Sequence, residues 1–85
     1  MSFAGWQFVL NEASAHFLLA LRARNRQRLL AALDALAANP HQKGDFEAND
    51  DTGRSIQVKV VGAFLVSFWA DAFVKELRII NIEWV

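Results

Sequence analysis

The hydrophobic pattern of this 85-residue chain changes its period once, at Asn39-Pro40, and that change limits what the chain can fold into. Before it, apolar residues recur every three or four positions, as in amphipathic helices. From Lys43 onward they alternate, as in strands with one buried face. Helices followed by strands predict an α+β domain of two layers, with a helical hairpin packed on one face of an antiparallel sheet. We expect a single domain over residues 1–85, because this length leaves no room for a second core.

The helical half begins after a short aromatic and β-branched run, Trp6–Leu10, which predicts a strand that joins the sheet edge. Asn11 is suited to cap the helix that follows, and apolar residues at positions 13, 17, 18 and 21 give that helix its buried stripe. A second stripe, between Leu29 and Ala37, predicts a second helix that ends before Pro40. We expect a turn or kink in Arg22–Arg28, although one bent helix fits nearly as well.

The strand half predicts a meander of three or four strands, so the expected order is β-α-α-β-β-β(-β). Residues 45–49 alternate, and residues 50–53 have the composition of a turn. In the next strand, 54–61, we expect Ile56, Val58 and Val60 on one face and Ser55, Gln57 and Lys59, facing outward, on the other.

Gly62 predicts a hairpin turn with positive φ between that strand and the strand at 64–69. After a turn at 71–73, the last strand covers residues 75–85. Its alternation changes parity across Ile79-Ile80, which indicates either a β-bulge or burial on both faces.

Composition excludes several function classes. Hydrophobic residues are 54% of the chain and charged residues 21%, so disorder is not expected. Cysteine is absent, which excludes disulfides and thiolate chemistry, and two histidines, His16 and His41, cannot complete a zinc site by themselves. We expect no metal and no cofactor. The net charge of zero disfavours a protein held to nucleic acid by bulk charge.

No apolar run reaches the roughly 20 residues that span a bilayer, and residues 1–6 lack the pattern of a signal peptide. We therefore expect a cytoplasmic protein with no membrane partner.

Two dense groups of charge remain. The arginines at positions 22, 24, 26 and 28 could grip phosphate or an acidic partner, but a solvated helix junction is the favoured interpretation in a neutral chain. The acidic residues at positions 45, 47, 50 and 51 lack the ordered ligands of a calcium loop, so we interpret them as the charge that protects an edge strand.

Basic residues that project from the predicted strands form a third group. Arg54, Lys59 and Arg78, with acidic residues such as Asp71 and Glu83, could line one polar sheet surface suited to phosphate contacts and a carboxylate base. Ordinary cross-strand ion pairs are the favoured alternative.

Order and motifs together resemble the RelE/ParE superfamily of type II toxin–antitoxin toxins. The resemblance covers roughly residues 6–83. It is carried by Leu33–Pro40, Gly44-Asp45 and Gly53–Val58, and by the closing runs Phe64–Asp71 and Leu77–Glu83. It implies the α+β fold already expected, and a cognate antitoxin protein as partner. It also implies one of two targets, mRNA on the ribosome or DNA gyrase.

The resemblance also bears on a catalytic site. Ribonucleases of the superfamily have an active surface rich in Lys and Arg, often with a Tyr or His near the C-terminus. Here Ser55 and Gln57 occupy outward positions expected to be basic, Phe64 stands where an Arg is expected, and tyrosine is absent.

The carry-over leaves Arg54, Lys59 and Arg78 as partial cationic candidates, with Glu83 as the base. The leading hypothesis is a toxin or toxin-like protein neutralised by an antitoxin, with Trp6, Trp69 and Trp84 as anchors, at least one of them in the core. The alternatives are an mRNA interferase that uses those four residues, and a non-enzymatic interaction module or homodimer.

Overall fold

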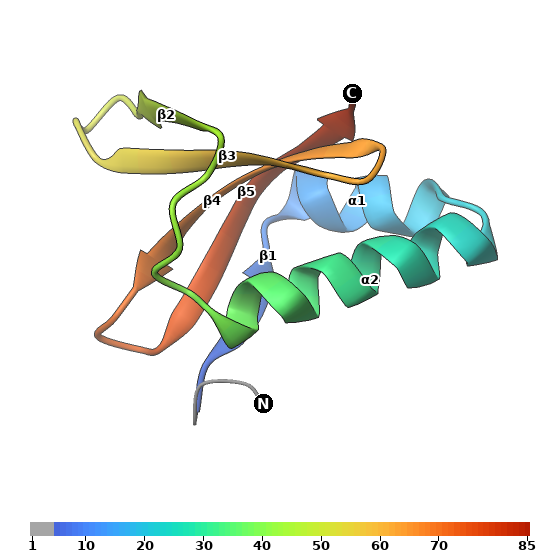
Figure 1. The fold of residues 1–85 in the computed structure, drawn as a ribbon, viewed down its shortest axis with the longest axis horizontal. Coiled ribbons are helices and arrows are strands. Elements are labelled where there is room, and N and C mark those ends of the chain that lie inside the picture. Colours follow the sequence, from blue (N-terminus) through green and yellow to red (C-terminus); the bar gives the residue numbers. More distant parts are fainter. Residues whose placement is uncertain (1–4) are drawn as a thin grey trace.

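The fold consists of two helices on one side of a five-stranded sheet (Figure 1). It is seen in a computed structural model that describes residues 5–85. Residues 1–4, on which the prediction about a signal peptide partly rests, lie outside the described residues. The sheet has the strand order β1-β5-β4-β3-β2. This confirms the predicted α+β architecture. The elements are β1 (Gln7–Leu10), α1 (Glu12–Ala20), α2 (Ala23–Ala38), β2 (Phe46–Asn49), β3 (Ser55–Val61), β4 (Phe64–Asp71) and β5 (Glu76–Trp84).

The first helix begins where the sequence predicts. Asn11 is the N-cap of α1, and its side-chain oxygen accepts a hydrogen bond of 2.9 Å from the backbone N–H of Ser14. This bond satisfies one of the backbone donors that every helix leaves unpaired in its first turn.

The junction between the helices is shorter than predicted. Only Leu21 and Arg22 have extended backbone, and α2 already starts at Ala23. The prediction of a turn across Arg22–Arg28 is wrong after its first residue, because arginine is a good helix former and needs no apolar neighbours to continue a helix. The guanidinium of Arg26 reaches back and donates a 2.8 Å hydrogen bond to the carbonyl of Leu21, which ties the junction to the second turn of α2.

Two irregularities of the sheet lie where the sequence predicts them. Gly62 has φ +63° in the turn between β3 and β4, where Val61 pairs with Phe64. In β5, Ser67 pairs with Asn81 and Phe68 with Ile79, so Ile80 is one extra residue. The parity change is therefore a β-bulge, which lets both halves of β5 bury their apolar residues on one face.

The first strand lies at the sheet edge as expected, but it is not antiparallel to its neighbour. β1 pairs in parallel with β5, with Gln7 opposite Glu76 and Leu10 opposite Ile79. Strands β2 to β5 form an antiparallel meander, and this meander gives β5 the same direction as β1. The sheet is therefore antiparallel, as predicted, except for this one parallel pair at its edge.

The core lies between the helices and the inner face of the sheet. Leu29 and Leu33 of α2 and Val66 and Leu77 of the sheet are wholly buried in it. Gln57 pairs with buried Phe68 across the β3–β4 ladder. Residues opposite each other share a face, so Gln57 belongs to the helix side.

The same register corrects the predicted faces of β3. Lys59 pairs with Val66 and so lies on the helix side, whereas Val60 pairs with Leu65 on the opposite, outer face and is 40% exposed. Ile56 is buried, yet it stands outside the main core cluster. The alternation of β3 is real, but its apolar set faces away from the helices.

No helix among residues 5–85 is both long and apolar enough to cross a membrane.

Candidate functional site

Two of the predicted site residues meet over one tryptophan on the outer face of the sheet. The guanidinium carbon of Arg54 lies 3.9 Å from the ring centroid of Trp69, and that of Arg78 lies 5.8 Å from it. Arg78 pairs directly with Trp69 between β5 and β4. An indole face attracts cations, so the ring holds the two like charges near each other. We call Arg54, Trp69 and Arg78 the arginine–tryptophan cluster.

Carboxylates neutralise this cluster. The Nε of Arg78 lies 3.1 Å from Asp71 and its Nη2 lies 3.0 Å from Glu76, while Arg54 lies 3.4 Å from Asp50. Two cations thus face three acidic side chains, all partly exposed. Such an arrangement stabilises the ends of β3, β4 and β5 by the modest amount typical of exposed ion pairs, and it offers little free positive charge to a phosphate.

The other two predicted site residues lie apart from the cluster. Lys59 is on the helix side of the sheet. Glu83 is on the outer face, but it pairs with Leu65, four residues along β4 from Trp69, or about 13 Å at the usual strand rise. The carboxylate of Glu83 accepts a 2.7 Å hydrogen bond from Asn81. The expectation that Lys59 shares one polar surface with Arg54 and Arg78 is therefore wrong.

A hollow of about 370 Å³ opens beside the cluster. It lies between the loop after α2 and the strands β3 and β4, and Pro40, His41, Lys43, Arg54 and Trp69 are among its lining residues. Its lining is mixed in polarity, with two of the chain's cations at its edge. Of the three predicted cationic site residues, Arg54 lines this hollow, whereas Lys59 and Arg78 do not.

The acidic segment serves the edge hairpin formed by β2 and β3. Glu47 accepts hydrogen bonds of 2.6 Å from the Ser55 hydroxyl and 2.8 Å from the Gln57 amide, and these bonds hold its pKa below the ordinary value. Asp50 accepts from the Thr52 hydroxyl and from the backbone N–H groups of Thr52 and Arg54. The Thr52 hydroxyl is the main reason that the pKa of Asp50 is also lowered.

These carboxylates therefore organise a turn on an edge strand. Within residues 5–85, no three acidic or histidine side chains come close enough together to hold a metal ion.

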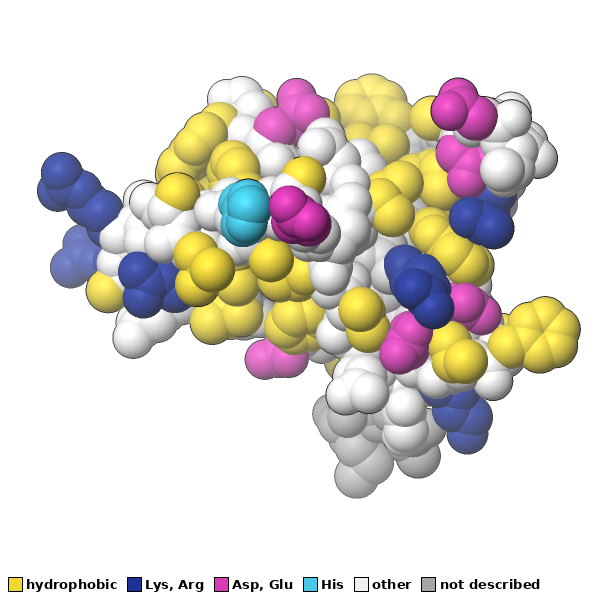
Figure 2. All heavy atoms as spheres, turned by 180° about the vertical axis from the view of Figure 1, so that it is seen from behind, with side chains coloured by type: hydrophobic (Ala, Val, Ile, Leu, Met, Phe, Trp, Pro, Cys, Tyr) yellow, Lys and Arg dark blue, Asp and Glu magenta, His cyan; other side chains and the backbone are white. Residues whose placement is uncertain are grey.

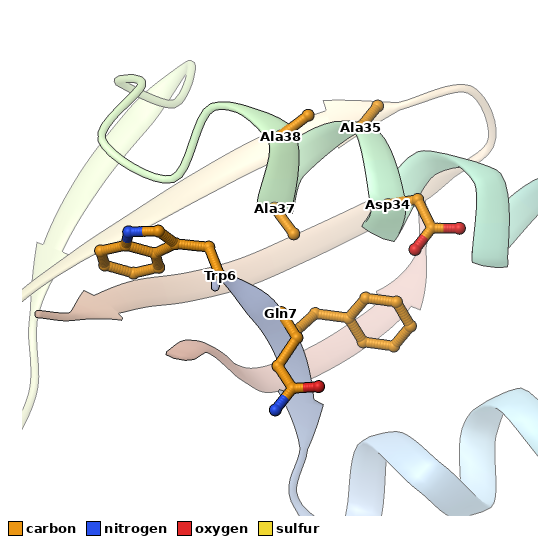
Figure 3. A pocket seen from close by; sticks show the side chains of 7 residues that line it. Trp6, Gln7, Asp34, Ala35, Ala37 and Ala38 are labelled. Atoms are coloured by element: carbon orange, nitrogen blue, oxygen red, sulfur yellow. The ribbon is translucent and has the colours of Figure 1, made fainter. Parts of the chain in front are cut away.

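The tryptophans are not in the core. Trp6 and Trp69 are partly exposed and Trp84 is 50% exposed, so the expectation that at least one is buried in the core is wrong. Trp6 packs edge-on against His41, with ring centroids 5.1 Å apart. Figure 3 shows the Trp6 ring lying below Ala37 and Ala38 of α2, with the Gln7 side chain turned away from that helix. These residues line a hollow of about 620 Å³ beside β1.

A second basic group lies at the other end of the molecule, where α1 meets α2. Arg22, Arg24 and Arg28 are all exposed there. In Figure 2, dark-blue side chains gather at this end, on the left, with no acidic side chain beside them, whereas blue and magenta alternate on the right. The sequence contained this signal, but a neutral total charge made the segment look like ordinary solvated surface.

Comparison with known proteins supports the fold. No family model matches the chain, and no curated protein matches it significantly. Among solved structures, the fold is similar to a chain in the crystal structure of the archaeal RelE–RelB complex from Pyrococcus horikoshii OT3, with a TM-score of 0.70 and 16% sequence identity. The similarity covers 94% of this chain and 94% of that chain. The chain therefore has a RelE-like fold.

Proposed function

We propose that this chain is the toxin component of a toxin–antitoxin pair and that an antitoxin protein binds and neutralises it. The observation that carries this proposal is the match to the RelE–RelB complex over 94% of both chains. The similarity extends over almost the whole of both chains and is not limited to their cores. A similarity of this extent supports a similar kind of binding partner more strongly than a match of the cores alone. Exposed apolar residues in three separate places, Leu19, Phe46 and Trp84, also support a protein that is partly covered by another.

Growth of bacteria tests the proposal. The chain is expressed from an inducible promoter, alone and together with the gene that neighbours it. We expect growth arrest with the chain alone and relief with the neighbour. Arrest that the neighbour does not relieve, or no arrest with soluble protein present, contradicts the proposal.

A second candidate is cleavage of mRNA at the arginine–tryptophan cluster. It is favoured by one observation: a guanidinium stacked at 3.9 Å on an indole at the edge of an open hollow, which is a surface that suits a nucleotide base and its phosphate. In this proposal the phosphate displaces the carboxylate partners of Arg54 and Arg78, and the two guanidinium groups then stabilise the charge that develops at phosphorus. Lys59 and Glu83 complete the site only if the RNA bridges to them, because they lie apart.

The second candidate has its own test, provided that the wild type arrests growth. Arg78→Ala should abolish arrest and transcript cleavage while the circular dichroism spectrum stays that of the wild type. Lys59→Ala and Glu83→Gln serve as comparisons, since their loss would extend the site beyond the cluster. Arrest without any change in transcript integrity excludes the ribonuclease and leaves a toxin with another target.

A further inference from the structure

The three exposed arginines at the helix junction have no partner within the described chain. The ion pairs of residues 5–85 involve Arg54 and Arg78 only, and Arg22, Arg24 and Arg28 take part in none of them. Arg26 differs, because its guanidinium is used internally, as a donor to the carbonyl of Leu21. Three free guanidinium groups therefore lie within seven residues of a chain whose net charge is zero.

This placement does not help the fold. Positive side chains in the first turns of a helix oppose the positive end of its dipole, and α2 has no acidic residue in its first turn. Arg24 and Arg28 are also four residues apart, so they repel each other on neighbouring positions of the helix surface. A charge distribution that costs folding energy and makes no contact points to a ligand.

Two mainly apolar hollows lie beside two of these arginines, Arg22 and Arg28. One hollow of about 320 Å³ lies between the end of α1 and Trp84, with Arg22 and Asn25 at its side. A second, of about 400 Å³, lies between α2 and the β3–β4 turn, with Asn25 and Arg28 at its side. Asn25 lines both, so the two hollows adjoin at that residue, and we call them together the groove along α2.

Aromatic rings form the floor of this groove. Phe64 and Trp84 lie 4.9 Å apart between ring centroids, and Phe17 lies about equally far from both, at 6.1 Å and 5.9 Å. Phe64 is buried, whereas Trp84 is half exposed and presents its ring to whatever enters. A half-exposed tryptophan on a packed aromatic base is a typical anchor for an apolar side chain.

We propose that this groove binds an acidic amphipathic segment of a partner protein. Its apolar side chains would pack on Trp84 and its carboxylates would pair with Arg22, Arg24 and Arg28. The combination of apolar and cationic side chains in this groove favours a protein ligand over nucleic acid, because a phosphate backbone has no apolar groups to pack on the aromatic floor. The inference deepens the proposed function and rests on it in one respect: the segment would belong to the antitoxin.

A synthetic peptide tests the groove directly. The probe is a helical peptide of roughly 18 residues, long enough to be helical in water, with Leu on one face and Glu on the other. Its counterpart carries Lys in place of Glu. Calorimetry gives the affinity, and amide chemical shifts locate the peptide. We expect the Glu peptide to bind, with shifts at Asn25, Ala32 and Gly62, and the Lys peptide not to bind.

Two charge-matched double variants separate local from overall charge. Arg24→Glu/Arg28→Glu should weaken the Glu peptide by about tenfold or more. Lys43→Glu/Lys75→Glu changes the net charge equally, at exposed sites away from the groove, and should bind as the wild type does. Equal effects of the two variants, equal binding of both peptides, or no binding of either overturns the proposal.

Two other occupants would also overturn it. A single-stranded RNA oligonucleotide that binds the same residues more tightly than the Glu peptide would assign the groove to nucleic acid. A dimer detected by light scattering at low salt and abolished by Arg24→Glu/Arg28→Glu would assign it to a second copy. The outcome of the growth experiment does not depend on the outcome of the peptide experiment. A groove that binds the peptide in a protein without toxin activity is therefore distinguishable from a toxin whose groove does not bind the peptide.

Discussion

The side-chain amide of Asn11 donates a 2.8 Å hydrogen bond to the backbone carbonyl of Ile80, the extra residue of the β5 bulge. The oxygen of the same amide caps α1 through Ser14. One side chain therefore joins the start of a helix to an irregularity 69 residues away. An amide serves both contacts because its oxygen accepts one hydrogen bond while its NH2 group donates the other.

Substitution of Asn11 should reveal both contacts. Asn11→Ala loses the cap and the bond to Ile80, and should lower the free energy of unfolding by about 1–2 kcal/mol. Asn11→Asp loses the bond to Ile80 and turns a carboxylate toward that carbonyl, but it keeps the cap. It should therefore lower the free energy of unfolding less than Asn11→Ala does. Urea denaturation measures both. Asn81→Ala, which removes only an exposed contact with Glu83, should change stability by less than about 0.5 kcal/mol.

Two valines on neighbouring strands test which face of the sheet is the core. Val66 is wholly buried against the helices, and Val66→Ala should cost about 2–3 kcal/mol because it removes packed methyl groups and leaves a cavity. Val60 is 40% exposed on the other face, and Val60→Ala should cost well under half as much. Equal losses in thermal or urea unfolding would contradict the assignment of faces.

Acid should loosen the turn between β2 and β3. The pKa of Asp50 is lowered in the folded state by its hydrogen bonds, chiefly the one from Thr52. A carboxyl with a lowered folded pKa contributes stability that is complete above its ordinary value of about 4 and is lost as the pH falls through the folded value. The protection factors of the Thr52 and Arg54 amides, which correct for the intrinsic pH dependence of exchange, should therefore decrease below about pH 4. Asp50→Asn should lower these protection factors at neutral pH and make them nearly independent of acid.

Arg24→Glu should stabilise the protein. The change removes a repulsion with Arg28 and places a negative charge near the positive end of the α2 dipole, which together are worth roughly 0.5–1 kcal/mol. Urea denaturation at low salt should show the gain, and high salt should reduce it. A loss of stability would mean that Arg24 makes a contact that the fold needs.

Several features of the fold could be predicted from the sequence because they depend on the residues at and beside them. Gly62 and Asn11 each have a conformational role that few other residues perform as well, and the parity change at Ile79-Ile80 has the bulge as one of two explanations. Each of these features depends on residues close to it in the sequence. Together with the change of hydrophobic period at Asn39-Pro40, they predict the β-α-α-β-β-β order.

Other features depended on distant parts of the chain. The alternation of β3 gives its two sets of residues but not which set faces the helices, because the outer face of this sheet also carries apolar residues such as Val60. The pairing of β1 with β5 joins segments about 70 residues apart. Of the candidate site, Arg54 and Arg78 meet because Trp69 lies between them on β4, and Lys59 was misplaced together with the face of its strand.

The parallel pairing of β1 with β5 also governs when this protein can fold as it is synthesised. β5 lies between β1 and β4, so the first strand made must wait for the last before either side of the sheet is closed. Until residues 76–84 have left the ribosome, the helices have only an incomplete surface to pack on, and the nascent chain stays open to proteases and chaperones. A chain released before β5 is made lacks the strand that joins β1 to the rest of the sheet, together with the core residues Leu77, Ile79 and Ile82.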